Sequence, residues 1–448
     1  MKQEIVFPKN LYSDVRIEER FSIWLNIQNG DIDGDGEISE KGAMIRVYDG
    51  TMWYTSSTND LDSIQKELDS LAELANPNPD IYEDPAISLL EVNHDRIFRY
   101  EGENDIRKIT RAEWKELADD YVEKCIDDSI PEMNFWCAYA NANHHVYSFY
   151  SSKGAKLEHD NQECSIGVAY GFTVDGVTTY GNKQYTRFRF EDLKHHEDEV
   201  LAQRDKVIDY ARNAVDVEPG DYCCVLAPIV TAMFTHESFG HKSESDFMLN
   251  DKTLQEEWII GKKVGSELVS ICDDGGMSNH GYKPYDDEGT KAKETWLIQG
   301  GILTGRLHDA NSASVLKETL TGNCRAQSYL HMPIVRMTNT YMKGGDTDPE
   351  KLLEGIEDGI YIDNVSSGTG QSMFTMRPTL CYRIRNGKKC EPLRVNVVNG
   401  NVFKTLFDIE AVGNDFELFD EYSCGKNGQG AAVSAGGPSI RVKSLTIN

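Results

Sequence analysis

The chain has 448 residues, of which 39% are hydrophobic and 10% aromatic, so it is long enough for two packed domains. Acidic residues outnumber basic ones 74 to 46, and the formal net charge is −28. A surface this negative repels phosphate backbones, so we expect no direct contact with nucleic acid.

The N-terminal sequence "MKQEIVFPKNLYSDV" lacks the apolar core of a signal peptide, and no run of about 18 apolar residues follows anywhere. We therefore expect no membrane segment. The 10 cysteines are scattered without a C-x-x-C pair. This pattern argues against a disulfide scaffold and favours a reducing compartment, so we expect a cytoplasmic protein.

The N-terminal half alternates strand and helix patterns. Residues 13–30 and 43–58 show the polar–apolar alternation of strands, and we expect the two to pair across the Asp- and Gly-rich turn between them. The elements expected next are amphipathic helices over 60–76 and 109–127, a β-rich stretch over 133–190 and a charged helix over about 191–214.

The segment "DIDGDGEISEKG", residues 31–42, fits a calcium-binding EF-hand loop at its first seven positions. Its twelfth position is Gly42, where that loop needs a bidentate glutamate, and its flanks have strand patterns instead of helix patterns. We therefore interpret the segment as the turn of a β-hairpin.

A Pro-Gly-Asp turn at 219–221 marks the expected boundary between two domains, 1–218 and 219–448. Pro228 suits the first turn of a helix, and the apolar run after it predicts that this helix is buried. Short strands fill most of the remainder, with one helical patch at 349–357. The predicted fold class is α+β: an N-terminal half of sheet and helices, and a β-rich C-terminal half carrying the buried helix.

The stretch "HESFGH" places His236 and His241 five residues apart, one more than in the zinc-protease pattern H-E-x-x-H. On a regular α-helix, residues five apart point about 140° away from each other. Two such imidazoles cannot both reach one Zn²⁺ at ~2.1 Å. A single π-helical turn would bring both onto one face, and Gly240 lowers the cost of that distortion.

Two interpretations of this helix stay open on the residues alone. It is either a metal site on a distorted helix or a buried helix whose histidines hydrogen-bond within the core. A catalytic zinc also needs a third protein ligand, which must be a Cys, His, Asp or Glu from elsewhere in the chain. Composition does not choose that ligand.

Four sequence blocks resemble the TldD/PmbA family, in which H-E-x-x-x-H is the metal-binding pattern. They follow one another in the family's order and span most of 220–447. The blocks are "VLAPIVTAMFTHESFGHKSESD" (225–246), "DDEGTKAKETWLIQGGIL" (286–303), "TGNCRAQSYLHMPIVRMTNTYM" (321–342) and "GNDFELFDEYSCGKNGQGAAVSAGGPSIRVKSLTI" (413–447).

In TldD-type members, the two motif histidines and the cysteine of the C-G-K-x-G-Q block hold the metal. The resemblance therefore implies that His236, His241 and Cys424 bind zinc. A thiolate suits Zn²⁺, and the metal would hold Cys424 deprotonated. Glu237, adjacent to a ligand, would act as the general base. The alternative for Glu237 is a helix carboxylate paired with a lysine.

Four polar residues of the block 321–342 are candidates for substrate binding. Their side chains could hold the substrate backbone or stabilise an oxyanion. For Arg336 and Asn339, holding a loop together is an equally good interpretation. The four candidates are His331, Arg336, Asn339 and Tyr341.

The resemblance implies a zinc-dependent peptidase that hydrolyses unfolded or extended peptides in an enclosed, dimeric active-site channel. Residues 1–218 would supply the channel and the dimer contact. PmbA-type subunits lack the H-E-x-x-x-H ligands, so the intact motif indicates a TldD-like chain, either a homodimer or a heterodimer with a PmbA-like subunit. Two alternatives stay open: a non-catalytic regulatory subunit of the gyrase-modulator type, and a peptidase active only with a PmbA-like partner.

Overall fold

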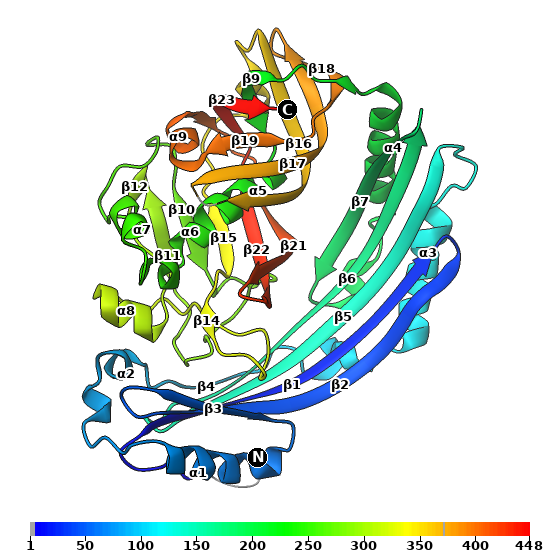
Figure 1. Ribbon diagram of the computed structural model, residues 1–448. Coiled ribbons are helices and arrows are strands. Elements are labelled where there is room, and N and C mark those ends of the chain that lie inside the picture. The colour runs from blue at the N-terminus through cyan, green and yellow to red at the C-terminus, as the bar shows by residue number, and fades with distance from the viewer. Residues whose placement is uncertain (1–4, 371) are drawn as a thin grey trace.

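One seven-stranded sheet makes up most of the N-terminal half. Its strands are β1 (Tyr12–Gln28), β2 (Asp31–Tyr48), β3 (Trp53–Thr58), β4 (His94–Ile97), β5 (Met133–Ser151), β6 (Lys156–Val174) and β7 (Val177–Arg187). The strand order is β3-β2-β1-β5-β6-β4, and β7 pairs with β6 as well. The computed structural model describes residues 5–370 and 372–448. Figure 1 shows the sheet as a long curved layer with the C-terminal half on its concave side.

The helices of the chain are α1 (Ile64–Leu74), α2 (Pro85–Leu89), α3 (Arg111–Cys125), α4 (Glu197–Asn213), α5 (Pro228–Thr235), α6 (His241–Ser243), α7 (Lys252–Glu257), α8 (Ala310–Leu316) and α9 (Val402–Phe407). α1, α3 and α4 cover one face of the seven-stranded sheet, whereas α2 and α8 pack against Tyr12 on the opposite face at one end. Side chains alternate along a strand, and Ile23 and Leu25 of β1 pack in one core with α3 and α4. Arg16 and Arg20 lie on the opposite face, where their guanidinium groups donate to backbone carbonyls of the loop 327–331.

The C-terminal half contains two larger sheets. Its strands are β8 (Val215–Asp216), β9 (Gly220–Leu226), β10 (Ile271–Asp274), β11 (Glu294–Gln299), β12 (Ile302–Leu303), β13 (Cys324–Arg325), β14 (Ile334–Val335), β15 (Asn339–Met342), β16 (Asp358–Gly370), β17 (Met373–Arg385), β18 (Lys388–Arg394), β19 (Val398–Asn401), β20 (Ile409–Val412), β21 (Glu417–Lys426), β22 (Gln429–Gly437) and β23 (Ile440–Ile447). One sheet has the order β12-β11-β10-β15-β22-β21, and the other has β16-β9-β23-β19-β17-β18-β8 with β20 beside β23.

The predicted buried helix lies at the centre of this half. α5 packs against β22 of the first sheet and β16 of the second. Its apolar residues Val230 and Phe234 are fully buried and belong to the main C-terminal core. Pro228 occupies the first turn of the helix, as the sequence predicts. The two sheets therefore hold α5 from both sides, and the two histidines follow directly after this helix.

The interpretation of residues 31–42 as a hairpin turn is wrong. These residues lie in β2 and pair with β1, so that Leu25 faces Asp35. The turn is formed by Asn29 and Gly30, which both have positive φ angles. Asn-Gly is a stronger signal for a two-residue hairpin than the Asp-Gly pairs after it. An extended strand cannot wrap its carboxylates around a cation, so the EF-hand reading is also excluded.

Most of the other predicted elements are confirmed. The three predicted N-terminal helices correspond to α1, α3 and α4, and the β-rich stretch corresponds to β5, β6 and β7. The predicted helical patch at 349–357 is instead a 3₁₀ turn, Pro349–Leu353. The division of the chain at residues 218 and 219 stays a proposal, and β8 just before it already pairs with β18 of the C-terminal half.

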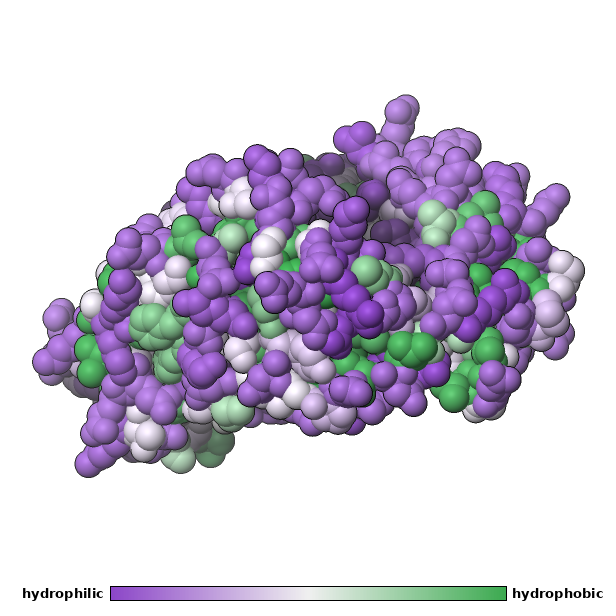
Figure 2. Space-filling model, turned by 90° about the horizontal axis from the view of Figure 1, so that it is seen from above, coloured by the Kyte–Doolittle hydropathy of each residue, from purple (hydrophilic) through white to green (hydrophobic). Residues whose placement is uncertain are grey.

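The hydrophilic surface and the free cysteines match what the composition predicts. Figure 2 shows a mostly hydrophilic face on which hydrophobic residues are scattered. No helix in the described part of the chain is long and apolar enough to cross a membrane. All ten cysteines are free, and most are buried, as expected for apolar packing residues instead of a disulfide framework.

Candidate metal centre

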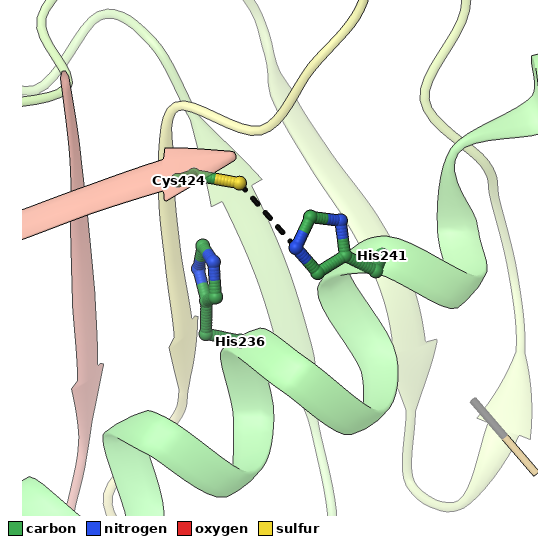
Figure 3. A group of neighbouring side chains, drawn as sticks. All are labelled: His236, His241 and Cys424. Atoms are coloured by element: carbon green, nitrogen blue, oxygen red, sulfur yellow. Dashed lines mark hydrogen bonds between the residues drawn. The ribbon is translucent and has the colours of Figure 1, made fainter. Parts of the chain in front are cut away.

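The two histidines lie on one face of a helix that contains a π-helical turn. α5 continues into the π-turn His236–Gly240 and then into α6. The wider turn brings the two imidazoles together, with ring centroids 5.1 Å apart. Figure 3 shows both rings rising from the same side of the helix toward Cys424. The distortion predicted from the five-residue spacing is confirmed.

Close packing explains the glycine at position 240. Its φ of −55° is an ordinary helical value, so backbone freedom is not the reason. A Cβ added to Gly240 would lie 1.9 Å from Sδ of Met337, and Met337 is fully buried. The turn can therefore approach the neighbouring core only where the side chain is absent.

We expect Gly240→Ala to lower the free energy of unfolding by about 1–3 kcal/mol, the usual effect of overpacking a core. Urea denaturation followed by circular dichroism measures this change. Gly425→Ala is the control, because Gly425 has open space at the Cβ position and an ordinary φ. Gly355 also has open space there, but its positive φ would strain an alanine. An unfolding midpoint equal to that of Gly425→Ala would contradict the packing explanation.

Cys424 reaches the helix from a distant part of the sequence. It lies on β21, opposite Ala431 of β22, in the hairpin that closes the six-stranded sheet. Its Sγ lies 3.4 Å from Nε2 of His241. One donor atom from each of His236, His241 and Cys424 can be chosen so that all lie within 4.8 Å of one another. The fold thus assembles the three residues that the family resemblance implies.

A buried network orients His241 and links it to the strand that carries Cys424. Nδ1 of His241 lies 3.0 Å from Oε2 of Glu244, which leaves Nε2 directed at Cys424. The ammonium of Lys426 lies 3.3 Å from the same Glu244 oxygen and 2.7 Å from Asp246. Because Lys426 follows Cys424 by two residues, these contacts hold the strand against the helix.

The cluster carries charge even without a metal. Burial alone would raise the pKa of Cys424, but the hydrogen bonds and charge of His236 and His241 lower this pKa to about 5. Burial opposes protonation of His241, whereas Cys424 and Glu244 raise its pKa to about 10. The metal-free pair is therefore a thiolate beside an imidazolium, and the proton on His241 must leave when a cation binds.

Glu237 lines a cavity of about 480 Å³ beside this cluster. The cavity lies between β7 and α4 of the N-terminal half and β16 and β21 of the C-terminal half. Burial raises the pKa of the Glu237 carboxyl. Within the described residues, its carboxylate has no ion pair, so the alternative of a lysine-paired helix carboxylate finds no support. Tyr422 also lines the cavity, with its ring parallel to that of His236.

Sequence comparisons place this site in a known family. A family model described as "PmbA/TldA metallopeptidase C-terminal domain" matches residues 219–448, and one described as "PmbA/TldA metallopeptidase domain 1" matches residues 13–76. A metalloprotease of Synechocystis sp. is 30% identical over 444 residues, which cover 97% of this chain and 94% of that protein. The chain belongs to the TldD/PmbA family of metallopeptidases.

Other relatives agree with this assignment. A zinc metalloprotease TldD homolog of Saccharolobus solfataricus is 38% identical over 312 residues, which cover 67% of this chain and 68% of that protein. The crystal structure of TldE from Thermococcus kodakarensis has the same fold, with a TM-score of 0.78 at 14% identity over 97% of this chain and 96% of that one. Relatives named metalloproteases support a peptidase role in general.

The four candidate substrate residues of this TldD/PmbA chain lie outside the described lining of the cavity beside Glu237. Arg336 is buried and donates to the carbonyls of Cys424 and Gln429. The side chain of Asn339 bonds the backbone of the loop 274–281. These contacts match the loop-holding interpretation of both residues.

The other two candidates lie at separate places. His331 lies in the loop bound by Arg16, and its Nδ1 is 2.8 Å from Oγ of Ser328. Tyr341 on β15 packs edge-to-face against Phe416. Substrate contact by any of the four residues stays a prediction.

Several residues of the site were not identified from the sequence. Glu244 and Lys426 could have been identified as neighbours of the metal centre from their positions. Glu244 follows His241 by three residues and Lys426 follows Cys424 by two, and the elements that carry the two ligands must meet. The cavity residues Asn182, Lys183 and Gln184 on β7 carried no signal, because nothing local in that strand indicates its partner in the C-terminal half.

Proposed function

We propose that this chain is a zinc-dependent peptidase of the TldD type. The observation that carries the proposal is the convergence of His236, His241 and Cys424 beside the Glu237 carboxylate. Three nitrogen and sulfur donors with one open position are the usual ligand set of a catalytic zinc.

The separation of Cys424 and His241 suits a tetrahedral ion. Bonds of about 2.0–2.3 Å at tetrahedral angles separate two donors by roughly 3.3–3.8 Å, and Sγ of Cys424 lies 3.4 Å from Nε2 of His241. Nδ1 of His236 is buried and has no hydrogen-bond partner among the described residues. Glu244 fixes the orientation of His241 through its other ring nitrogen, as carboxylates commonly do for metal-binding histidines.

The residues of the chain divide the chemistry among them. A zinc ion held here would supply Lewis acidity to the scissile carbonyl and to the attacking water. The Glu237 carboxylate takes a proton from that water and passes it to the leaving amine. Glu237 is adjacent to His236 on the π-turn, so the same local distortion that groups the histidines also positions the base.

Substrates in extended form suit the cavity. Five consecutive residues of β16, Asn364–Gly368, line it, so the cavity meets the edge of this strand and not one of its faces. β9 pairs with β16 only over Gly359–Ile362, and no other described strand covers the edge beyond. An extended peptide can add to such an edge through backbone hydrogen bonds. Folded proteins do not offer free backbone in this form.

The proposed assembly is a dimer that encloses this cavity. It is either a homodimer or a heterodimer with a PmbA-like subunit, and light scattering of the purified chain alone distinguishes the two. The similarity in fold to TldE supports an assembly of related chains. A non-catalytic regulatory role is the alternative function, and it requires that purified protein lacks hydrolytic activity.

Metal analysis tests the zinc centre directly. We expect the purified protein to hold close to one zinc per chain under non-chelating conditions, because three preorganised donors converge. His236→Ala and Cys424→Ala should each lose most of this zinc, measured by plasma mass spectrometry. Cys390→Ala is the matched control, since Cys390 is exposed. A wild-type protein without zinc, or a Cys424→Ala variant that keeps it, would contradict the proposal.

A further inference from the structure

A second cavity, of about 90 Å³, lies between the concave face of the N-terminal sheet and the C-terminal half. One wall is a row of side chains in register across three strands, Arg20 of β1, His145 of β5 and Asn161 of β6. The C-terminal wall consists of His280, Tyr282, Lys283, Arg325, Ala326, Gln327 and residues 430–432. A water needs about 10–15 Å³ of such volume, so the cavity can hold several waters or one small polyatomic ion.

Basic side chains outnumber carboxylates in this lining, although the whole chain carries −28. Arg20, Lys283 and Arg325 line the cavity, and Glu163 is the one carboxylate in the lining. Glu163 already pairs with His280, and Lys283 pairs with the buried Asp287.

Arg325 is the cation that most needs a counter-ion. It is 8% exposed, and its guanidinium donates only to the backbone carbonyls of Met337 and Ala432. No described carboxylate forms an ion pair with it, whereas Arg20 pairs with Glu18 and Lys283 pairs with Asp287. An uncompensated buried charge costs several kcal/mol. A bound anion would remove that cost.

Three residues of the lining also carry buried polar atoms without partners. Nε of Arg20, the hydroxyl of Tyr282 and the amide oxygen of Asn161 are buried and have no hydrogen-bond partner among the described residues. Each such group costs about 1–3 kcal/mol when left unsatisfied. The Asn161 amide can present either its oxygen or its NH₂ group to the cavity. Waters could satisfy these atoms, but they would not neutralise Arg325.

We propose that this cavity binds a small oxyanion, either a free anion such as phosphate or the carboxylate that ends a peptide chain. Guanidinium and ammonium groups bind both kinds of oxyanion through charge-assisted hydrogen bonds. The site lies close to the candidate metal centre, because Ala431 in its lining is the β22 partner of Cys424. It is nevertheless a separate site, since its lining contains none of the three candidate ligands or Glu237.

Titration calorimetry with inorganic phosphate tests the proposal. We expect saturable binding to the full-length protein after removal of metal, so that phosphate cannot bind at the metal centre, with sodium chloride at equal ionic strength as the reference. Arg325→Gln removes the buried cation that has no ion-pair partner among the described residues and should weaken the Kd roughly tenfold or more, the effect of losing a hydrogen bond to a charged group.

Arg189→Gln is the matched control, because Arg189 is exposed. Arg325→Gln also removes the hydrogen bonds to the carbonyls of Met337 and Ala432, so circular dichroism of the variant has to show a native spectrum before its affinity is compared. Non-saturable binding, or equal phosphate affinity in the two variants, would mean an adventitious ion only and would overturn the proposal.

The two sources of the anion are distinguished with a pair of peptides that differ only in a free or amidated C-terminus. Displacement of phosphate by the free acid alone assigns the site to a chain terminus. Displacement by neither peptide assigns it to a free anion. A crystal soaked in selenate should show an anomalous peak beside Arg325, and ordered water alone in that cavity would contradict both assignments.

Discussion

Glu237→Gln is expected to lower kcat/KM for peptide hydrolysis by roughly 10²–10⁴-fold, the usual contribution of a general base. Glutamine keeps the shape of the side chain but cannot accept and return a proton. The substitution should leave the zinc content unchanged, because the candidate ligands are His236, His241 and Cys424. Steady-state kinetics on an unstructured fluorogenic peptide, with metal analysis of the same preparation, measures both quantities.

Glu73→Gln provides the control for this substitution, since Glu73 is exposed at the end of α1, in the N-terminal half. It should retain full activity. Hydrolysis by Glu237→Gln within tenfold of the wild type would remove Glu237 from the role of base. Loss of zinc together with activity would instead show that Glu237 supports the metal centre and would leave its role as base undecided by kinetics.

The local structure of the metal centre was predictable from the sequence to an unusual extent. The five-residue spacing of the histidines is incompatible with a regular α-helix, so the π-turn at His236–Gly240 follows from the assumption that both residues bind one ion. The assumption itself came from the family resemblance, as did Cys424. Nothing in residue spacing could select one cysteine among ten, because the hairpin of β21 and β22 brings it to the helix only in the folded chain.

The errors in the predicted fold have identifiable physical causes. The Asp-Gly pairs of residues 31–42 favour a turn, yet the Asn29–Gly30 turn precedes them and leaves them to pair with β1. This charged, glycine-containing part of β2 is stable because β3 pairs only with residues 43–48, which leaves residues 31–42 at the edge of the sheet with their carboxylates in solvent. Hydrophobic alternation, which identified the other strands, is absent from such an edge.

Sequence patterns could not predict the contacts between the two halves of the chain. Both cavities have walls from the N-terminal sheet and from the C-terminal half. Arg16 and Arg20 of β1 face the C-terminal half and donate to carbonyls of the loop 327–331, yet their charge alone is equally compatible with a solvent-exposed face. Alternation shows that one face differs from the other, but it does not show whether the polar face meets water or a second polar surface.

Lys426→Met is expected to lower the free energy of unfolding by about 3–5 kcal/mol, the range for removing one partner of a buried ion pair. The change removes one of the two cationic partners of the fully buried Glu244 carboxylate and leaves it only His241. It also releases the contact with Asp246 and the hydrogen bond to the carbonyl of Val335. Urea denaturation of the metal-free protein measures the loss without a contribution from bound zinc.

The same substitution should weaken zinc binding by roughly 10–100-fold, the usual effect of disturbing the residue that orients a ligand. Lys426 holds Glu244, and Glu244 holds His241, so the disturbance reaches the metal through two contacts. Competition with a chromophoric chelator measures the affinity. Lys404→Met is the control, because the Lys404–Asp408 pair is exposed and contributes at most about 0.5 kcal/mol.

A double substitution separates the ion pair from simple packing. If the Glu244 carboxylate without Lys426 is the main cost, Glu244→Gln should recover part of the stability that Lys426→Met loses, since it removes the buried charge. Zinc affinity should not recover, because the glutamine amide no longer supports His241 as a carboxylate does. Strictly additive losses of stability, or unchanged zinc affinity in Lys426→Met, would show that the network does not connect the strand of Cys424 to the helix of His241.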